Sequence, residues 1–242
     1  MFYLFSMKSF KAYLDLCRIS NLPTVWTNVL AAVVLSDIEV FPWSSFIILS
    51  LSLSFFYSGG MCLNDLWDVA VDRFDKPFRP LPSQRISIKG ATLFTLVLFG
   101  VALSLLLLVP YPRALCAGFF LLALIGIYNR IHKRYSFSVF LMAACRWMVF
   151  IVSAIAVSGT VGKFVVVAGF LQFVYILILS LVSRYENRII RKFSISLIPM
   201  MLASISLLDG VVMAILTSPA WLTAGIIGVA LTYLGQKFVR GD

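Results

Sequence analysis

The chain has 242 residues, of which 61% are hydrophobic and only 12% are charged. A water-soluble core of this length cannot bury so much apolar surface, so the composition excludes a soluble globular protein and places the excess in lipid. The 20 Lys and Arg residues outnumber the 10 Asp and Glu residues, which gives a net charge of +10. Because most of these cations fall in loops that would share one side of a membrane, we interpret them as a topology signal and expect no nucleic-acid partner.

Eight apolar segments follow one another along the chain, each about long enough to cross a ~30 Å hydrocarbon core as a helix. They predict an all-α, polytopic bundle of about eight transmembrane helices, with residues 1–242 forming a single membrane domain. Residues 1–17 mix aromatic and charged side chains, and we expect an interfacial amphipathic segment there, in contact with membrane lipid. The expected spans are residues 21–36, 43–66, 91–109, 114–130, 137–158, 163–182, 194–216 and 219–236.

The basic residues are distributed unevenly between the two ends of these spans. They precede the first span, follow the second, fourth and sixth spans, and end the chain. Cytoplasmic loops are rich in Lys and Arg, so we expect both termini and the large basic loops on the cytoplasmic side of an inner or plasma membrane. An even number of spans agrees with this orientation.

An acidic cluster appears where the second span should leave the membrane. Its members are spaced so that, on an α-helix, they face one side within about a quarter of a turn. Carboxylates gathered this closely repel one another unless a cation compensates them, and such oxygen ligands suit Mg²⁺. We therefore predict Mg²⁺ as the cofactor. The cluster consists of Asn64, Asp65, Asp68, Asp72 and Asp75, of which the first four are the expected metal ligands.

Basic residues follow this cluster directly, namely Arg73, Lys76 and Arg79. Together with a metal, they could hold the phosphate groups of a substrate at the cytoplasmic mouth of an apolar bundle. A solvated helix end paired with a basic loop is the simpler explanation for two isolated aspartates. The additional acids and the proline-rich run of residues 76–82 favour a diphosphate site instead.

Residues 64–72 (NDLWDVAVD) and 75–82 (DKPFRPLP) resemble the first signature of the UbiA prenyltransferase superfamily. This resemblance implies a helical bundle around a central cavity that opens to the cytoplasmic face. It also implies transfer of a prenyl group from a prenyl diphosphate, bound through Mg²⁺, to an apolar acceptor. Asp68 and Asp72 would then be catalytic. Residues 18–23, Asn28 and residues 128–133 extend the similarity, which implies substrate binding by Asn64, Arg73, Lys76, Arg79, Lys133, Arg18, Asn28 and Tyr128.

A second aspartate-rich motif, usual in that superfamily after the sixth span, is altered here. Residues 180–188 (SLVSRYENR) carry one carboxylate, on Glu186, while Ser183 and Asn187 are neutral. In one interpretation, Arg184 replaces the second cation and Glu186 keeps a reduced ligand role, so both are catalytic. In the other, the chain keeps the cavity and binds or transports an isoprenoid or other apolar metabolite without chemistry. The altered motif and the short length resemble UbiA-like proteins of the EboC type.

Two charged residues lie deep within expected spans, away from their ends, and the chain has a single histidine. Arg146 lies deep in the fifth span, where a charge is costly unless it faces a cavity or a partner. We expect it to contact substrate, the alternative being a structural pair. Asp209 could be such a partner or could mark a break between two short helices. We expect His132 to be an interfacial loop residue rather than a general base.

Overall fold

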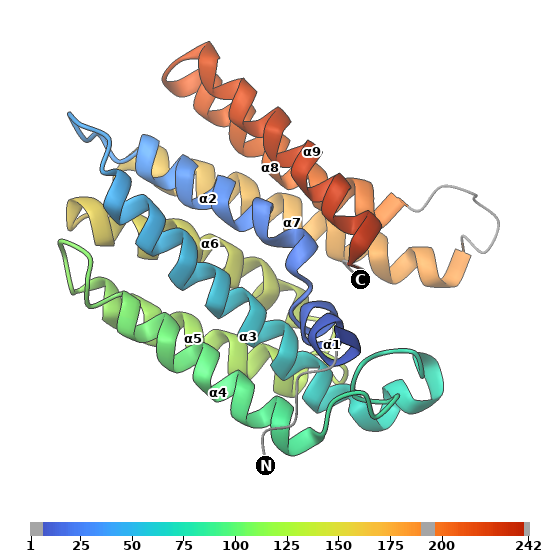
Figure 1. The fold of residues 1–242 in the computed structure, drawn as a ribbon. Helices are drawn as coiled ribbons and strands as arrows, with labels where there is room; N and C mark the ends of the chain where they lie inside the picture. Colours follow the sequence, from blue (N-terminus) through green and yellow to red (C-terminus); the bar gives the residue numbers. More distant parts are fainter. Residues whose placement is uncertain (1–6, 190–196, 240–242) are drawn as a thin grey trace.

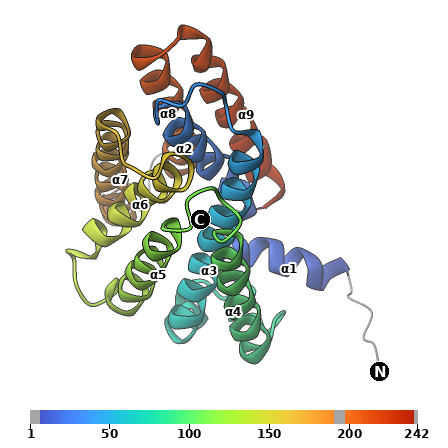
Figure 2. The same cartoon turned by 90° about the vertical axis from the view of Figure 1, so that its left-hand side faces the viewer.

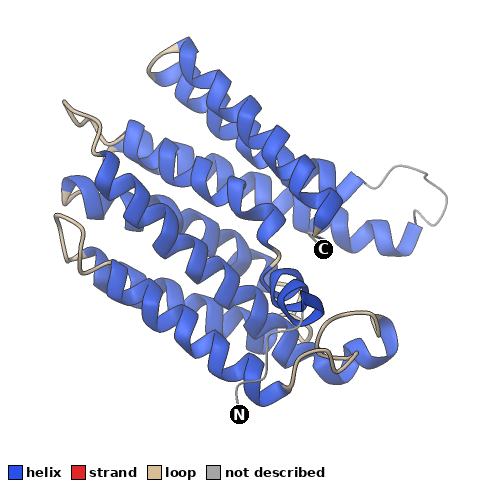
Figure 3. Cartoon of the chain, in the orientation of Figure 1, coloured by secondary structure: helices blue, strands red, loops and turns tan. Residues whose placement is uncertain are grey.

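A computed structural model describes the backbone of residues 7–189 and 197–239, and the side chains of residues 10–183 and 197–239. Within these ranges the chain is helical and contains no strand, which confirms the predicted fold class (Figures 1 and 3). Each of the expected spans overlaps one α-helix of the described residues, with ends that differ by up to nine residues. The α-helices are α1 (Met7–Cys17), α2 (Leu22–Val34), α3 (Trp43–Asp75), α4 (Ile88–Leu105), α5 (Ala114–Ile131), α6 (Ser138–Ser158), α7 (Lys163–Ile189), α8 (Leu197–Leu216) and α9 (Leu222–Phe238).

Six of the helices described, α3 to α8, are long and apolar enough to cross a membrane. Many large apolar side chains on them are exposed, as expected where lipid rather than water surrounds the bundle. The chain is therefore an integral membrane protein. The apolar stretch Ile19–Val34, which contains α2, is shorter than these helices. A total of eight spans stays a prediction.

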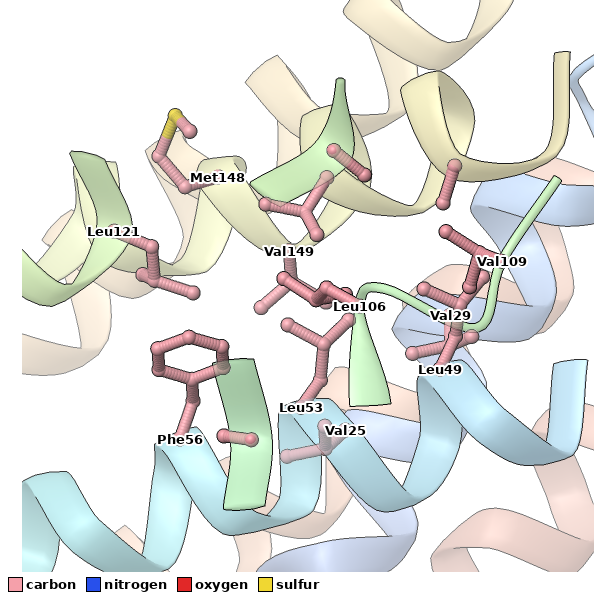
Figure 4. Close-up of a cluster of buried hydrophobic side chains, with 14 of the residues drawn as sticks. Val25, Val29, Leu49, Leu53, Phe56, Leu106, Val109, Leu121, Met148 and Val149 are labelled. Carbon is pink, nitrogen blue, oxygen red and sulfur yellow. The ribbon is translucent and has the colours of Figure 1, made fainter. Parts of the chain in front are cut away.

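Helix α2 lies in the centre of the bundle and packs against α3, α6, α8 and α9 (Figure 2). It can be buried on most sides because its side chains are small or apolar, including Val25, Val29, Ala31 and Ala32. The main apolar cluster joins α2 and α3 to the helices around them, as Figure 4 shows for the labelled side chains. This packing leaves polar side chains of α2 facing inward.

Helices α8 and α9 form a close pair that depends on glycine. A Cβ atom added to Gly225 would lie 2.8 Å from the Ser206 carbonyl oxygen and 2.9 Å from the Gly210 Cα. Small residues are what allow two membrane helices to approach this closely. Helix α8 runs without interruption from Leu197 to Leu216, so the possible break at Asp209 was a wrong prediction. Asp209 is tolerated inside a continuous helix because neighbouring helices supply hydrogen bonds to it.

Helix α1 runs across the bundle rather than along it: Figure 1 shows it end-on, whereas α2 to α9 are seen from the side. Figure 2, turned by 90°, shows α1 projecting sideways, away from the other helices. This direction suits the interfacial segment expected from the sequence. The loops that follow α3 and α5 lie at the same end, so the basic segments of the sequence gather there.

Candidate functional site

The last three turns of α3 carry the acidic cluster. At 33 residues, α3 is longer than a bilayer requires, so its C-terminal part extends beyond the apolar segment. Asp65, Asp68 and Asp72 are 3%, 6% and 4% exposed, which shows that they face the protein rather than solvent. Asn64 is half-buried beside them, whereas Asp75 at the end of the helix is exposed. The 3- and 4-residue spacing therefore places three carboxylates on one inward-facing strip of the helix.

Asp65 is held between two arginines that come from different segments. Its Oδ1 atom lies 3.2 Å from the Arg18 Nη2 atom and 3.2 Å from the Arg79 Nη1 atom. The same Arg79 nitrogen lies 2.6 Å from Asp72 Oδ2. Arg18 reaches Asp65 from the turn between α1 and α2, where its backbone is left-handed, with φ of 48°. The structure thus assigns Asp65 to an ion-pair network, although the sequence had predicted it as a metal ligand.

Asp68 and Asp72 converge on one cationic atom. The Lys133 Nζ atom lies 3.2 Å from Asp68 Oδ1 and 4.0 Å from Asp72 Oδ1. An ammonium thus occupies a position between two carboxylates on the same helix face. The described residues include no group of three or more His, Cys, Asp and Glu side chains arranged to hold a metal ion. A metal bound to this pair would need further oxygen ligands, such as waters and substrate phosphates.

His132 and Asn129, at the end of α5, complete the contacts around Asp68. The His132 Nε2 atom lies 3.1 Å from Asp68 Oδ2, and its Nδ1 atom lies 3.0 Å from the Asn129 carbonyl oxygen. The hydrogen bond with Asp68 raises the pKa of His132 above its ordinary value. The Asn129 side chain accepts a hydrogen bond from Asn64 at 3.1 Å. Sequence reasoning missed both roles, although residues 129, 132 and 133 have the spacing of one helix face.

A cavity of about 390 Å³ lies beside the acidic strip. One end is polar and includes Arg18, Lys76, Arg79, Tyr128 and Asn129. The rest is mainly apolar and is walled by side chains such as Val25, Leu53, Phe56, Leu121, Ile125, Val149, Ile176, Leu202 and Ile205. A cavity with one charged end and an apolar body suits a molecule that has an anionic head and a hydrocarbon tail.

Arg146 lies in the wall of this cavity, away from the acidic strip in the sequence. Its Nη2 atom donates a hydrogen bond of 2.6 Å to Thr24 Oγ1 on α2. A guanidinium group has five N–H donors, so this contact leaves donors that could serve a ligand. The sequence suggested two alternatives for Arg146, and the structure shows features of both: Arg146 lines the cavity, and it has a polar partner in Thr24.

Four predicted substrate residues do not line the cavity, and of these Asn64 and Lys133 lie at the acidic strip, whereas Asn28 and Arg73 lie elsewhere. Asn28 is completely buried, and its side-chain amide donates a hydrogen bond of 2.7 Å to Asp209 Oδ2. Gln172 donates to the other Asp209 oxygen, also at 2.7 Å. Asn28 therefore supports a buried polar group between α2 and α8 and does not line the cavity, and its expected contact with substrate stays a prediction. Arg73 is exposed and is likewise absent from the cavity wall.

The altered second motif lies at the end of α7. Ser183 lines the cavity, so this segment of α7 reaches the candidate site. The side chains of Arg184, Glu186 and Asn187 lie outside the described residues. Their expected roles stay predictions.

Several known proteins with similar sequences share one name. The chain is 38% identical over 98 residues to the digeranylgeranylglyceryl phosphate synthase of Methanococcus vannielii, an overlap of 39% of this chain and 35% of that protein. It is 35% identical over 124 residues to the enzyme of the same name from Sulfolobus acidocaldarius, covering 50% of this chain and 42% of that one. The matches thus span less than half of these relatives' length.

Solved structures share the fold over nearly the whole chain. A structure described as digeranylgeranylglyceryl phosphate synthase in membranes matches with a TM-score of 0.65, 19% identity and 96% of both chains covered. A UbiA homologue from Archaeoglobus fulgidus, bound to GPP and Mg²⁺, matches with a TM-score of 0.61, 15% identity, and 94% and 97% coverage. The sequence pattern of the UbiA prenyltransferase family matches residues 24–241. The chain belongs to the UbiA prenyltransferase family.

Proposed function

We propose that this protein is a membrane prenyltransferase that transfers a prenyl group from a prenyl diphosphate to an apolar acceptor. The observation that carries the proposal is the convergence of Asp68 and Asp72 on the Lys133 ammonium beside a largely apolar cavity. The arrangement separates a charged end, suited to a diphosphate, from an apolar end, suited to a prenyl chain. Membership of the family supports the same assignment.

We propose Mg²⁺ as the cofactor, held by Asp68 and Asp72 with Asn64 beside them. The fit follows from the Lys133 contacts, because the two carboxylates already face a single cationic position. Mg²⁺ typically binds one or two carboxylates plus substrate phosphates, and Asp68 and Asp72 would supply the two carboxylates. When bound, it would neutralise charge on the leaving diphosphate.

Residues of the protein itself would bind the diphosphate and exclude water from the reaction. Arg18, Lys76 and Arg79 line the polar end of the cavity, where they could bind phosphate oxygens and stabilise the diphosphate as the allylic C–O bond breaks. Apolar walls such as Leu53 and Phe56 would exclude water and so protect the allylic cation from hydrolysis. The acceptor then forms the new bond to that carbon and loses a proton.

We also propose that Arg146 binds the acceptor. It lies in the cavity wall on α6 and donates to Thr24, whereas the cations assigned to the diphosphate come from the turn before α2 and the α3–α4 loop. A guanidinium group in an apolar wall would favour an acceptor with an oxygen group. Arg184 and Glu186 stay candidates for a reduced second motif near Ser183, and a cytoplasmic position of both termini stays part of the proposal.

The test is turnover of radiolabelled prenyl diphosphates by purified protein with and without Mg²⁺, comparing Asp68→Asn with Asp75→Asn. Both substitutions remove one charge from α3, but Asp68 is buried at the site and Asp75 is exposed. Geranylgeranyl diphosphate and glyceryl phosphate lipids belong among the substrates tried, because the relatives are named for making digeranylgeranylglyceryl phosphate. Loss of transfer in Asp68→Asn but not in Asp75→Asn supports the proposal.

Two other results would contradict parts of it. Tight, Mg²⁺-dependent binding of prenyl diphosphates without turnover toward any acceptor would favour binding or transport of an isoprenoid. Failure to bind any prenyl diphosphate would refute the diphosphate site itself. Glu186→Gln, measured in parallel, tests whether the altered second motif takes part in prenyl transfer.

A further inference from the structure

A second cavity, of about 430 Å³, borders the Arg18–Asp65–Arg79 network. Its walls come from α1, the α3–α4 loop and the C-terminal end of α9. Nothing in the proposed reaction uses this space. Unlike the first cavity, it is bordered mainly by polar and charged side chains, so it is not another chamber for a hydrocarbon chain.

Positive charge exceeds negative charge in this second cavity. The lining residues include two carboxylates, and both of them already contact arginines. Asp65 lies between Arg18 and Arg79, and Asp15 lies 3.4 Å from Arg85. The two lysines in the wall, Lys11 and Lys237, have no carboxylate within ion-pair distance among the described residues. Both lysines are exposed, and the Lys237 Nζ atom lies 5.2 Å from the centre of the Tyr233 ring. Two lysines beside one cavity without a carboxylate partner favour an anionic ligand.

The surroundings of the cavity indicate the kind of anion. Helix α1 runs across the end of the bundle, as a helix in a membrane interface does (Figure 2). Phe78 and Phe238 line the cavity and are 52% and 75% exposed, and Phe10 on α1 is 58% exposed. Exposed aromatic side chains next to lysines are typical of the level where lipid head groups meet acyl chains.

We infer that this second cavity binds a phosphate group at the membrane surface, with Lys11 and Lys237 as the ligands that distinguish it from the reaction site. A phosphate carried by an anionic lipid fits the neighbouring phenylalanines, and free phosphate shares the same recognition chemistry. Arg18 and Arg79 line both cavities. An anion in the second cavity therefore contacts the same arginines that face the proposed diphosphate.

The experiment uses full-length wild-type protein, purified in a neutral detergent, and native mass spectrometry to count bound lipid. Dioleoyl phosphatidic acid is compared with dioleoylglycerol, which has the same acyl chains and no phosphate. Wild type is compared with Lys11→Gln/Lys237→Gln. The control is Lys89→Gln/Arg130→Gln, which removes two exposed charges that line neither cavity. All measurements are made without prenyl diphosphate, so the result does not depend on the proposed reaction.

The expected result is preferential retention of phosphatidic acid by wild type and by the control. Binding by the Lys11→Gln/Lys237→Gln protein should be roughly tenfold weaker, because two charge-assisted contacts are lost. Displacement by millimolar inorganic phosphate would identify a soluble phosphate as sufficient, whereas resistance to it would assign the lipid. Equal retention of dioleoylglycerol, or equal loss of binding in the control, would overturn the inference.

Discussion

Replacing Asp65 with Asn separates two roles that the sequence could not distinguish. Asp65 is 3% exposed, and one of its oxygens lies 3.2 Å from both Arg18 and Arg79. If Asp65 mainly holds these arginines, the substitution leaves two guanidinium groups facing a neutral amide. Arg79 keeps its 2.6 Å contact with Asp72, whereas Arg18 loses the carboxylate partner that the structure gives it.

The size of the effect follows from burial. At 3.2 Å and an effective dielectric constant of about 20, each charge contact contributes about 5 kcal/mol before desolvation is subtracted. Removing one partner of a buried ion pair typically costs about 3–5 kcal/mol. Because Arg79 retains Asp72, we expect the lower end, about 3 kcal/mol. For a chain of this size that corresponds to a fall of about 6–12 °C in the apparent Tm.

Asp68→Asn should behave differently. Its cationic partners, Lys133 and His132, have side chains 41% and 15% exposed. Water can replace part of the Lys133 contact, and an Asn oxygen can still accept the hydrogen bond from His132, so the stability change should be smaller than that of Asp65→Asn, about 1–2 kcal/mol. Both variants, with Asp75→Asn as the exposed control, are heated in the same detergent and followed by the loss of monodisperse protein on size exclusion. An unchanged Tm for Asp65→Asn, together with weakened Mg²⁺-dependent binding of prenyl diphosphate, would refute the ion-pair interpretation and restore Asp65 as a metal ligand.

Three further predictions concern packing, the acceptor and the metal. Gly225→Ala should lower the apparent Tm by several degrees, because the added Cβ would meet the backbone of α8. Gly126→Ala is the control, since the space around its Cβ is open, and it should leave the Tm unchanged. Equal shifts in the two variants would contradict the packing argument. Arg146→Gln should raise the acceptor KM by roughly tenfold without changing prenyl diphosphate affinity, measured by steady-state kinetics and equilibrium binding. Chelation of Mg²⁺ should abolish prenyl diphosphate binding in a filter assay, and readdition should restore it.

Hydropathy predicted the helices well because lipid imposes the rule that underlies it. A segment must offer about 20 apolar residues to cross the bilayer as a helix, so the positions of the spans follow from the hydropathy along the sequence. The shared face of Asp65, Asp68 and Asp72 was equally predictable, since the helical repeat fixes which residues point the same way. Both features are local properties of the chain.

The partners of those side chains were not predictable, because they come from distant segments. Arg18 is 47 residues from Asp65, and His132 is 64 residues from Asp68. Asn28 had a favourable position in the sequence pattern, but its amide is used by Asp209, 181 residues away. The packing of helices decides which of several nearby cations meets a given carboxylate, and local patterns along the sequence do not reveal that packing.

The contacts of Lys133 suggest how the site passes from its free to its loaded state. The three buried aspartates of α3 are balanced by Arg18, Arg79 and Lys133, so their formal charges cancel in the free protein. A diphosphate adds several negative charges and therefore needs additional cations, because these three are already paired with aspartates. Lys133 is the most exposed of the three balancing cations. It can turn toward a phosphate while a divalent cation takes its place between the two carboxylates. Diphosphate and Mg²⁺ should then bind as a unit, each raising the affinity for the other by the same factor.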